Sequence, residues 1–506
     1  MPKIAMPDIA SHPDKRKFAS KSGSGIRALV LACATAGMLG FGLFGPALAQ
    51  NANLSVKPDS GDIPIFTEKY ADAEFCADGT GNGPCAVAPV DVPEFDASFV
   101  YRFLAYHAQR PFDRFSWQAF TSLMAPVDDP SQPAIWESFP TRRTLFSEVG
   151  YPNSACAKDL PSGHLLLASY VQSSGDILID QAGNFVLYET RINPVAETYI
   201  RENDLQSPVG RKAFAASGQD ISFPTGHVFE EIVGKVPSND TDVGIPPSAP
   251  GVMGAQLLKF AWRILPSDGA SVNTTSGAYY ARPARIAVAG TDSLDGKPAC
   301  LDVTVGLVGL HLVQRVASGN GDRWIWASFE HVGNVPLAKN ARRPNSIITD
   351  NLFPDGCLAP DDAGDQFAFY GGKVGAGQEA NQSISGPLKW AREEPYARLA
   401  SGEVASGPDI VRCWRLFSGT AESNFIWQSK LGNSVWANYL LLGTQWIGNP
   451  GNAPFGVGEV PRYLTNSALE SFMQHQTDAS CLSCHDRATT DTGQRSNFTF
   501  LLDPLP

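Results

Sequence analysis

Three residues near the end of the sequence have the types and spacing of a cofactor-attachment motif. Cys481, Cys484 and His485 form the pattern C-x-x-C-H within "DASCLSCHDR". On one helical turn, two cysteines three positions apart can both reach the vinyl groups of a haem, and the adjacent histidine can bind the iron. The motif therefore predicts one covalently bound haem c, with His485 as the proximal iron ligand.

Two other kinds of site also use a C-x-x-C pair. A zinc site would need a second C-x-x-C or an H-x-x-x-H partner, and a thioredoxin-type redox pair would need a βαβ context. The sequence around the motif provides neither pattern. Covalent haem attachment is the interpretation that remains.

The second face of the iron needs a separate explanation, because no methionine follows Cys484. A residue earlier in the chain must bind there, or the site must stay open. His311 and His331 lie on apolar faces of predicted strands, and His227 follows "FPTG" in a predicted loop. A histidine on an apolar strand face is also a common core residue. These three are candidate distal ligands, and the sequence assigns no catalytic residue.

The first 49 residues have the pattern of an export signal. Basic residues between 15 and 27 precede the run "ALVLACATAGMLGFGLFGPALA", and Ala47-Leu48-Ala49 matches a cleavage site. An uncleaved anchor is the alternative, but the glycines and proline in the run favour cleavage. No later segment has the roughly 20 uninterrupted apolar residues of a spanning helix. We expect a periplasmic protein with no stable membrane span.

Cysteine usage agrees with an oxidising compartment. Apart from the motif and the signal segment, the cysteines are Cys76, Cys85, Cys156, Cys300, Cys357 and Cys413. An even number predicts disulfides, although six cysteines allow about fifteen pairings. Cys76 and Cys85 flank the turn-rich "ADGTGNGP", so this is the one specific pair that we predict. Buried thiols are the alternative for the other four.

The charge balance restricts the partners. The chain has 39 Lys and Arg against 51 Asp and Glu, a formal net charge of −12. Nucleic-acid binding depends on basic groups that neutralise phosphates, so this composition argues against it. An acidic surface suits a basic redox partner protein.

Strand patterns dominate the middle of the chain and predict a mainly β (α+β) protein with a large antiparallel domain. We expect an extended lead-in over 50–95, a β-rich domain over 96–465 and a haem-binding segment over 466–506 packed on it. Residues 301–318 and 323–333 are the most strand-like and should pair antiparallel across Gly-Asn-Gly. Other predicted strands are a hairpin at 175–192, then 255–265, 277–290 and a last strand at 497–502.

Helices are predicted on both sides of these strands. Residues 99–126 have apolar spacings of three and four, which predicts two short helices broken at Pro111. Residues 466–476 predict a further helix that leads to the motif, with Ser467 and Glu470 as a capping box.

Several segments resemble a known group of proteins. "FSWQAF", "GLVGLHLVQR", "WIWASFEHVGNVP", "LLGTQW" and "SALESFMQH…SCLSCH" are similar to exported bacterial proteins of the cytochrome c family. The resemblance implies one C-terminal haem c, held by Cys481, Cys484 and His485. "CLSCHDRATT…NFTF" also resembles cytochrome P460 more weakly, which implies a β-rich protein with an open iron site that binds or oxidises small nitrogen compounds.

Two functions therefore stay open. The first is a periplasmic monohaem c-type cytochrome that transfers electrons. The alternative is a P460-like haem oxidoreductase or gas-binding protein that acts on a small oxidant or nitrogen compound. The two functions differ at the second face of the iron: a protein ligand there is typical of an electron carrier, and an open site is typical of a haem enzyme or gas-binding protein.

Overall fold

A computed structural model describes most of the chain after the lead-in. The described residues are 88–91, 104–125, 131–146, 154–228, 251–266, 278–317, 323–342, 356–363, 367–446, 461, 463–476 and 479–503. All belong to one compact unit, Ala52–Pro506. The predicted signal peptide, most of the lead-in and the predicted Cys76–Cys85 pair lie outside these residues.

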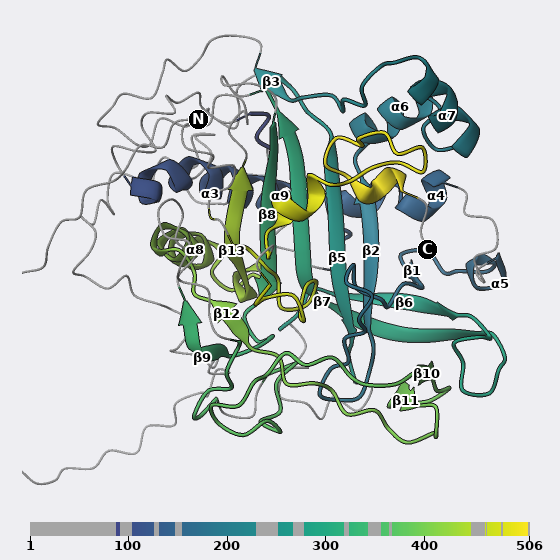
Figure 1. Ribbon diagram of the computed structural model, residues 1–506, viewed down its shortest axis with the longest axis vertical. Helices are drawn as coiled ribbons and strands as arrows, with labels where there is room; N and C mark the ends of the chain where they lie inside the picture. Colours follow the sequence, from purple (N-terminus) through teal and green to yellow (C-terminus); the bar gives the residue numbers. More distant parts are fainter. Residues whose placement is uncertain are drawn as a thin grey trace, which may run out of the picture. The chain divides into compact units, whose positions relative to one another are not determined.

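The centre of the fold is a seven-stranded sheet (Figure 1). Its long strand β7 pairs with β5 on one side, and with β6 and then β8 on the other. β2 extends the sheet from β5, β1 from β6, and β13 from β8. The strands are β1 (Leu165–Leu167), β2 (Val186–Ile192), β5 (Gln256–Ile264), β6 (Ala281–Val288), β7 (Ala299–Val316), β8 (Arg323–His331) and β13 (Tyr439–Trp446).

The predicted mainly β class is confirmed, and the sheet is mixed rather than purely antiparallel. β7 and β8 pair antiparallel as predicted, whereas β1 and β6 are parallel. The predicted hairpin at 175–192 turns at the expected place, where Asp180 N donates to Asn184 O (2.9 Å). Only its second arm forms a full strand, β2, and an isolated bridge between Ile179 and Phe185 joins the two arms.

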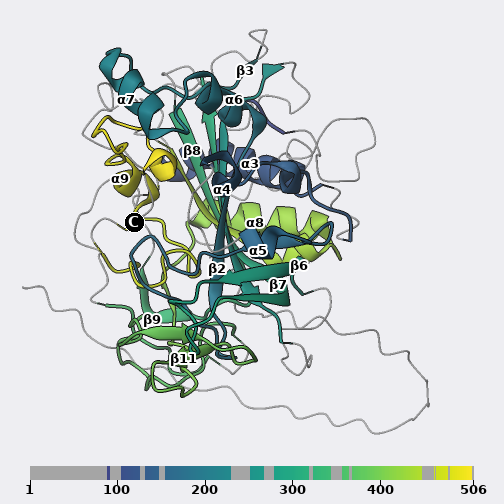
Figure 2. The same ribbon diagram turned by 90° about the vertical axis from the view of Figure 1, so that its right-hand side faces the viewer.

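Helices cover one face of the sheet. Trp117 and Phe120 of α3 (Leu104–Leu123) contact Phe329 of β8, and Trp427 of α8 (Ser418–Leu431) stacks on Trp117. Figure 2 shows these helices on one side of β8 and the C-terminal segment on the other. The remaining helices are α4 (Arg142–Phe146), α5 (Ser154–Ala157), α6 (Pro194–Glu202), α7 (Pro208–Ala216) and α9 (Cys481–His485), with 3₁₀ turns η1 (Ile135–Ser138), η3 (Val435–Asn438) and η5 (Phe500–Leu502).

The predicted break at Pro111 is wrong, because α3 continues through it as one helix of 20 residues. Proline removes a single backbone donor from a helix interior. The core contacts of Trp117 and Phe120 hold the C-terminal half of α3 against the sheet, and tertiary packing of this kind can outweigh a lost hydrogen bond.

Three pairs of short strands and two disulfides complete the described fold. The strand pairs are β3 (His227–Val228) with β4 (Gly251–Val252), β9 (Leu337–Arg342) with β12 (Arg412–Trp414), and β10 (Leu388–Trp390) with β11 (Ala397–Leu399). The disulfides join Cys156 to Cys300 and Cys357 to Cys413. These four cysteines therefore form disulfides and are not buried thiols.

The predicted helix at 466–476 is wrong, since these residues form successive turns. Both the backbone N and the Oγ of Ser467 donate to Oε2 of Glu330, at 2.9 and 2.6 Å, so this serine does not cap a helix. Glu470 instead accepts from Asn466 N (3.0 Å). Side-chain bonds of this kind compete with a regular helix. Arg412 forms a buried ion pair with Glu330 and so holds the carboxylate that binds Ser467.

The predicted last strand at 497–502 is also wrong. Asn497 and Phe498 have φ angles of +54° and +66°, which no extended strand contains, and η5 follows. This turn contacts the motif, because the Phe498 carbonyl lies 2.9 Å from Nδ1 of His485.

Candidate functional site

The motif residues lie on α9, a helix of five residues. Ser480 precedes it, and its Oγ accepts a hydrogen bond from Ser483 N (3.3 Å) while its carbonyl accepts one from Cys484 N (3.2 Å). Cys481 and Cys484 are both thiols in the structure. Residues three apart on a helix are neighbours on its surface. The short helix therefore carries the two thiols three positions apart, with His485 directly after the second.

Gln445 of β13 fixes this helix to the sheet. Its fully buried side chain accepts from Leu482 N (3.2 Å) and donates to the carbonyl of Pro461 (2.7 Å). The amide also donates to the Oγ of Ser480 (3.1 Å). Sequence reasoning did not identify Gln445, although a glutamine in the apolar segment "YLLLGTQW" is a detectable signal.

His485 has the hydrogen bonding of a metal-binding imidazole. Its Nδ1 lies 2.9 Å from the carbonyl oxygen of Phe498. A carbonyl can only accept, so Nδ1 carries the proton and Nε2 has the lone pair. The ring packs between Trp326 and Phe500, at centroid distances of 4.1 and 5.0 Å. Burial lowers the pKa of His485 to about 3, so the imidazole is neutral near pH 7.

The carbonyl that His485 contacts belongs to a strained turn. Asn497 and Phe498 are consecutive non-glycine residues in the left-handed region, which costs about 1–2 kcal/mol for an ordinary residue. Arg315 donates to the Asn497 side-chain oxygen (2.6 Å), and Phe223 N donates to the same atom (3.3 Å). These bonds hold the turn so that the Phe498 carbonyl faces His485. Backbone strain of this kind is common at functional sites.

A cluster of charged and polar residues lies on the same face of the sheet, close to the motif. Lys259 of β5 and His311 of β7 are directly opposite each other, and His311 Nε2 is 3.3 Å from Oε2 of Glu470. Burial lowers the pKa of Lys259, although Glu470 and the two motif thiols oppose this shift. Burial alone would raise the pKa of Glu470, but His311 and Lys259 outweigh it and the pKa falls. The structure thus brings His311 to the motif.

His331 is not brought to the motif. It lies near the end of β8 on the opposite face from Trp326, where its ring stacks on Tyr279 at 4.1 Å. Its Nε2 donates to Ala278 O (2.8 Å) and its Nδ1 accepts from Gly333 N (3.0 Å). Burial lowers its pKa to about 4. Both ring nitrogens already have partners, so His331 is a core histidine.

His227 is also distant from His311. It is exposed on the short strand β3, and the adjacent Gly226 pairs with Val316 of β7. Val316 is five residues along the strand from His311, which corresponds to about 16 Å. Of the three predicted distal candidates, the structure places only His311 beside the motif.

A metal cluster made of protein side chains is not found in the part of the chain that the structure describes: no group of three or more His, Cys, Asp or Glu could hold a metal ion. A haem iron needs only one or two protein ligands, because the porphyrin nitrogens provide four. The single neutral imidazole of His485, with its Nε2 lone pair and two neighbouring thiols, therefore fits a covalent haem better than a zinc ion.

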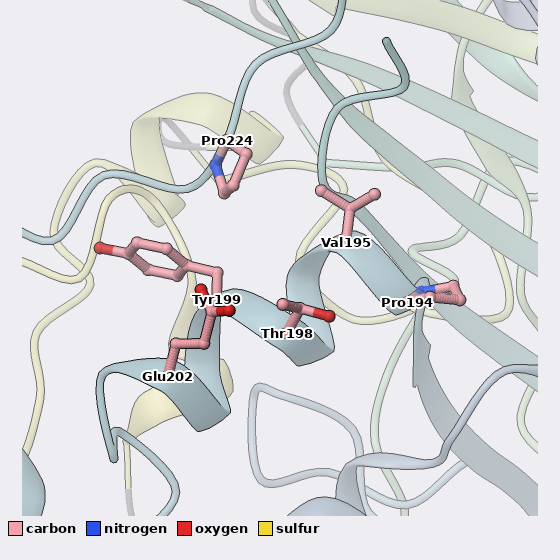
Figure 3. Close-up of a pocket in the computed structure, with 6 residues that line it drawn as sticks. All are labelled: Pro194, Val195, Thr198, Tyr199, Glu202 and Pro224. Carbon is pink, nitrogen blue, oxygen red and sulfur yellow. The ribbon is translucent and has the colours of Figure 1, made fainter.

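A separate surface hollow lies on α6 (Figure 3). Pro194, Val195, Thr198, Tyr199 and Glu202 of this helix line it, together with Pro224. The Tyr199 hydroxyl accepts from Ser222 N (2.9 Å), which holds the ring in place. This lining contains none of the motif residues, and Glu202 is its only charged side chain.

Comparisons with known proteins add no identification. No protein-family model matches the chain, and neither the curated proteins nor the solved structures contain a match. Among the described helices, none combines the length and apolar character needed to cross a membrane.

Proposed function

We propose that this chain is an exported monohaem c-type cytochrome that transfers electrons. Cys481 and Cys484 would attach the haem, and His485 would bind its iron through Nε2. One observation carries the proposal. His485, which is on the same short helix as the two thiols, donates Nδ1–H to the Phe498 carbonyl (2.9 Å). This hydrogen bond selects the tautomer that can bind iron.

The attachment chemistry uses only groups of the motif. Each thiol would add across a haem vinyl group, so that one S–C bond forms and the thiol hydrogen is transferred to the vinyl carbons. The bound haem would supply one-electron chemistry. The chain's own residues hold the imidazole: Trp326 and Phe500 pack against it, and Phe500 is 39% exposed.

Two further observations support export. The disulfides Cys156–Cys300 and Cys357–Cys413 are typical of an oxidising compartment, and the predicted signal peptide would direct the chain to the periplasm. Net charge is −12 before cleavage and becomes more acidic without the basic leader. The expected electron-transfer partner is therefore a protein with a basic surface.

The alternative is a P460-like haem enzyme or gas-binding protein, and one observation favours it. Lys259, His311 and Glu470 place buried charge beside the motif, and such groups often mark reactive sites. In that case an exogenous molecule such as nitric oxide or hydroxylamine would occupy the second iron face, and these residues would position it.

The test of the proposal is covalent haem binding by the exported, full-length chain. We expect a pyridine haemochrome of one thioether-linked haem per chain, which the Cys481→Ala/Cys484→Ala variant lacks. The Cys357→Ser/Cys413→Ser variant removes two distant cysteines and should retain the haem. Haem that stays covalent in the first variant would disprove the assignment. Carbon monoxide binding by the reduced wild-type protein would favour the alternative function.

A further inference from the structure

The surface hollow on α6 combines an apolar wall with a single charge. Its helical lining residues are spaced so that they share one face of α6, and Pro224 lies across from that face (Figure 3). Of the lining residues only Glu202 is charged, and it is exposed. The hollow has a volume of about 330 Å³, at the small end of the roughly 300–1,000 Å³ of small-molecule pockets. It therefore fits one long side chain better than a cofactor-sized ligand.

The charge of Glu202 is available to a cation from outside the chain. The neighbouring Arg201 forms its ion pair with Glu197 of the same helix (2.8 Å). Within the described part of the chain, Glu202 has no ion-pair partner. The whole chain has a formal net charge of −12. A basic protein would therefore be attracted by the net charge of this chain, and one of its cationic side chains could bind the Glu202 carboxylate.

Packed aromatic side chains connect the hollow to the motif. The ring of Tyr199 contacts Phe223 at a centroid distance of 4.9 Å, and Phe223 contacts Trp324 of β8 at 5.9 Å. Trp326 follows two residues later on the same face of β8 and contacts His485 at 4.1 Å. Electron tunnelling weakens steeply with distance. A partner bound at the hollow would be separated from His485 by only this short series of side chains.

We propose that the hollow on α6 receives a lysine or arginine side chain of a basic redox partner protein. This inference rests on the proposed function. The alkyl part of that side chain would pack on Val195 and Pro224, and its charged end would bind Glu202. Tyr199, which the hydrogen bond from Ser222 N holds in place (2.9 Å), would contact the cation with its ring. Electron transfer in this complex moves one electron from the reduced protein to the oxidised partner, and no proton or atom.

Binding to a basic redox protein of known charge tests the inference. The probe is the small, lysine-rich mitochondrial cytochrome c, and isothermal titration calorimetry with the purified holoprotein at low ionic strength measures its Kd. Glu202→Gln should raise this Kd about fivefold, the upper value for loss of an exposed ion pair. Glu197→Gln is the matched control, because it removes the same charge from another face of α6. It should raise the Kd less than about twofold, since it changes only the screened net field.

Thr198→Arg tests the hollow itself, because the new side chain would occupy it and pair with Glu202. Stopped-flow measurement should show electron transfer to the oxidised probe slowed by about tenfold, the lower range of electrostatic steering effects. Val209→Arg, the control, adds the same charge at a position of α7 that is 78% exposed and outside the lining, and it should slow transfer far less.

Three results would overturn the inference: wild-type protein that does not bind the probe, equal Kd values for Glu202→Gln and Glu197→Gln, or equal rates for Thr198→Arg and Val209→Arg. The two equalities would mean that net charge alone explains the association. Wild-type protein without covalent haem would instead disprove the proposed function, and the haemochrome measurement separates these two failures.

Discussion

The strained turn at Asn497 gives the sharpest prediction about the proximal side. The side-chain oxygen of Asn497 accepts hydrogen bonds from Arg315 and from Phe223 N. Removing a hydrogen bond to a charged group costs about 1.5–3 kcal/mol. Asn497→Gly keeps the left-handed φ of +54° accessible and loses only these bonds. We expect it to lower the free energy of unfolding by about 2 kcal/mol.

Asn497→Ala adds backbone strain to the same loss. An alanine in the left-handed region costs the folded state about 1–2 kcal/mol. Alanine also restricts the unfolded chain more than glycine does, which favours folding by about 0.4–1 kcal/mol. Asn497→Ala should therefore be less stable than Asn497→Gly by about 1 kcal/mol. Urea denaturation followed by tryptophan fluorescence measures both values. Equal stabilities would refute the claim that the left-handed backbone is required.

If the chain binds the proposed haem, the same substitutions should change its midpoint potential. When the turn loosens, His485 loses part of its hydrogen bond to Phe498 and becomes a weaker electron donor, so the midpoint potential should rise. A loss of about 1 kcal/mol corresponds to roughly 40 mV for one electron. Asn381 is the control, because it also has a positive φ (+59°) and buried side-chain bonds, but to Val411. Its Gly and Ala variants should show the stability difference without the potential shift. An unchanged potential at Asn497 would refute the role of the Phe498 carbonyl.

Three further predictions concern buried polar groups. Gln445→Leu leaves the Leu482 N–H without its acceptor, so we expect a loss of about 1–3 kcal/mol in unfolding free energy and less covalent haem per chain by haemochrome. Glu330→Gln leaves the buried Arg412 charge uncompensated and should cost about 3 kcal/mol in urea denaturation. Burial lowers the pKa of His331 to about 4, so below pH 6.5 the unfolded chain binds a proton that the folded chain does not. Stability should therefore fall from pH 6.5 to 4, and His331→Gln should reduce that slope by up to about 1.4 kcal/mol per pH unit.

The motif and the main strands could be predicted from the sequence because both signals are local. Alternation of apolar residues in 301–318 and 323–333 predicted the two strands that carry His311 and His331, although a bulge in β7 next to Leu307 reverses the faces within the first. The sequence could not predict that His311 lies near the motif whereas His331 is a core residue. These placements depend on which face receives the C-terminal segment and on partners distant in sequence, such as Glu470 beside His311 and Ala278 beside His331.

The failures of sequence reasoning near the motif have a common physical cause. Residues 466–476 have the spacing of a helix, but Ser467 bonds to a carboxylate 137 residues away in the chain. Residues 497–502 have the composition of a strand, but Arg315 holds Asn497 in a turn. In both cases a long-range polar bond overrides a local preference, and both bonds help to place groups around His485 and His311.

These bonds also explain why a haem motif would need so large a domain. A helix of five residues is far too short to be stable by itself, and α9 therefore depends on Gln445 of β13 and on the turn at Asn497. The sheet also provides Trp326, which packs against the His485 imidazole. If α9 carries the proposed haem, binding should stabilise the folded chain, because the attachment helix forms only where these elements pack together.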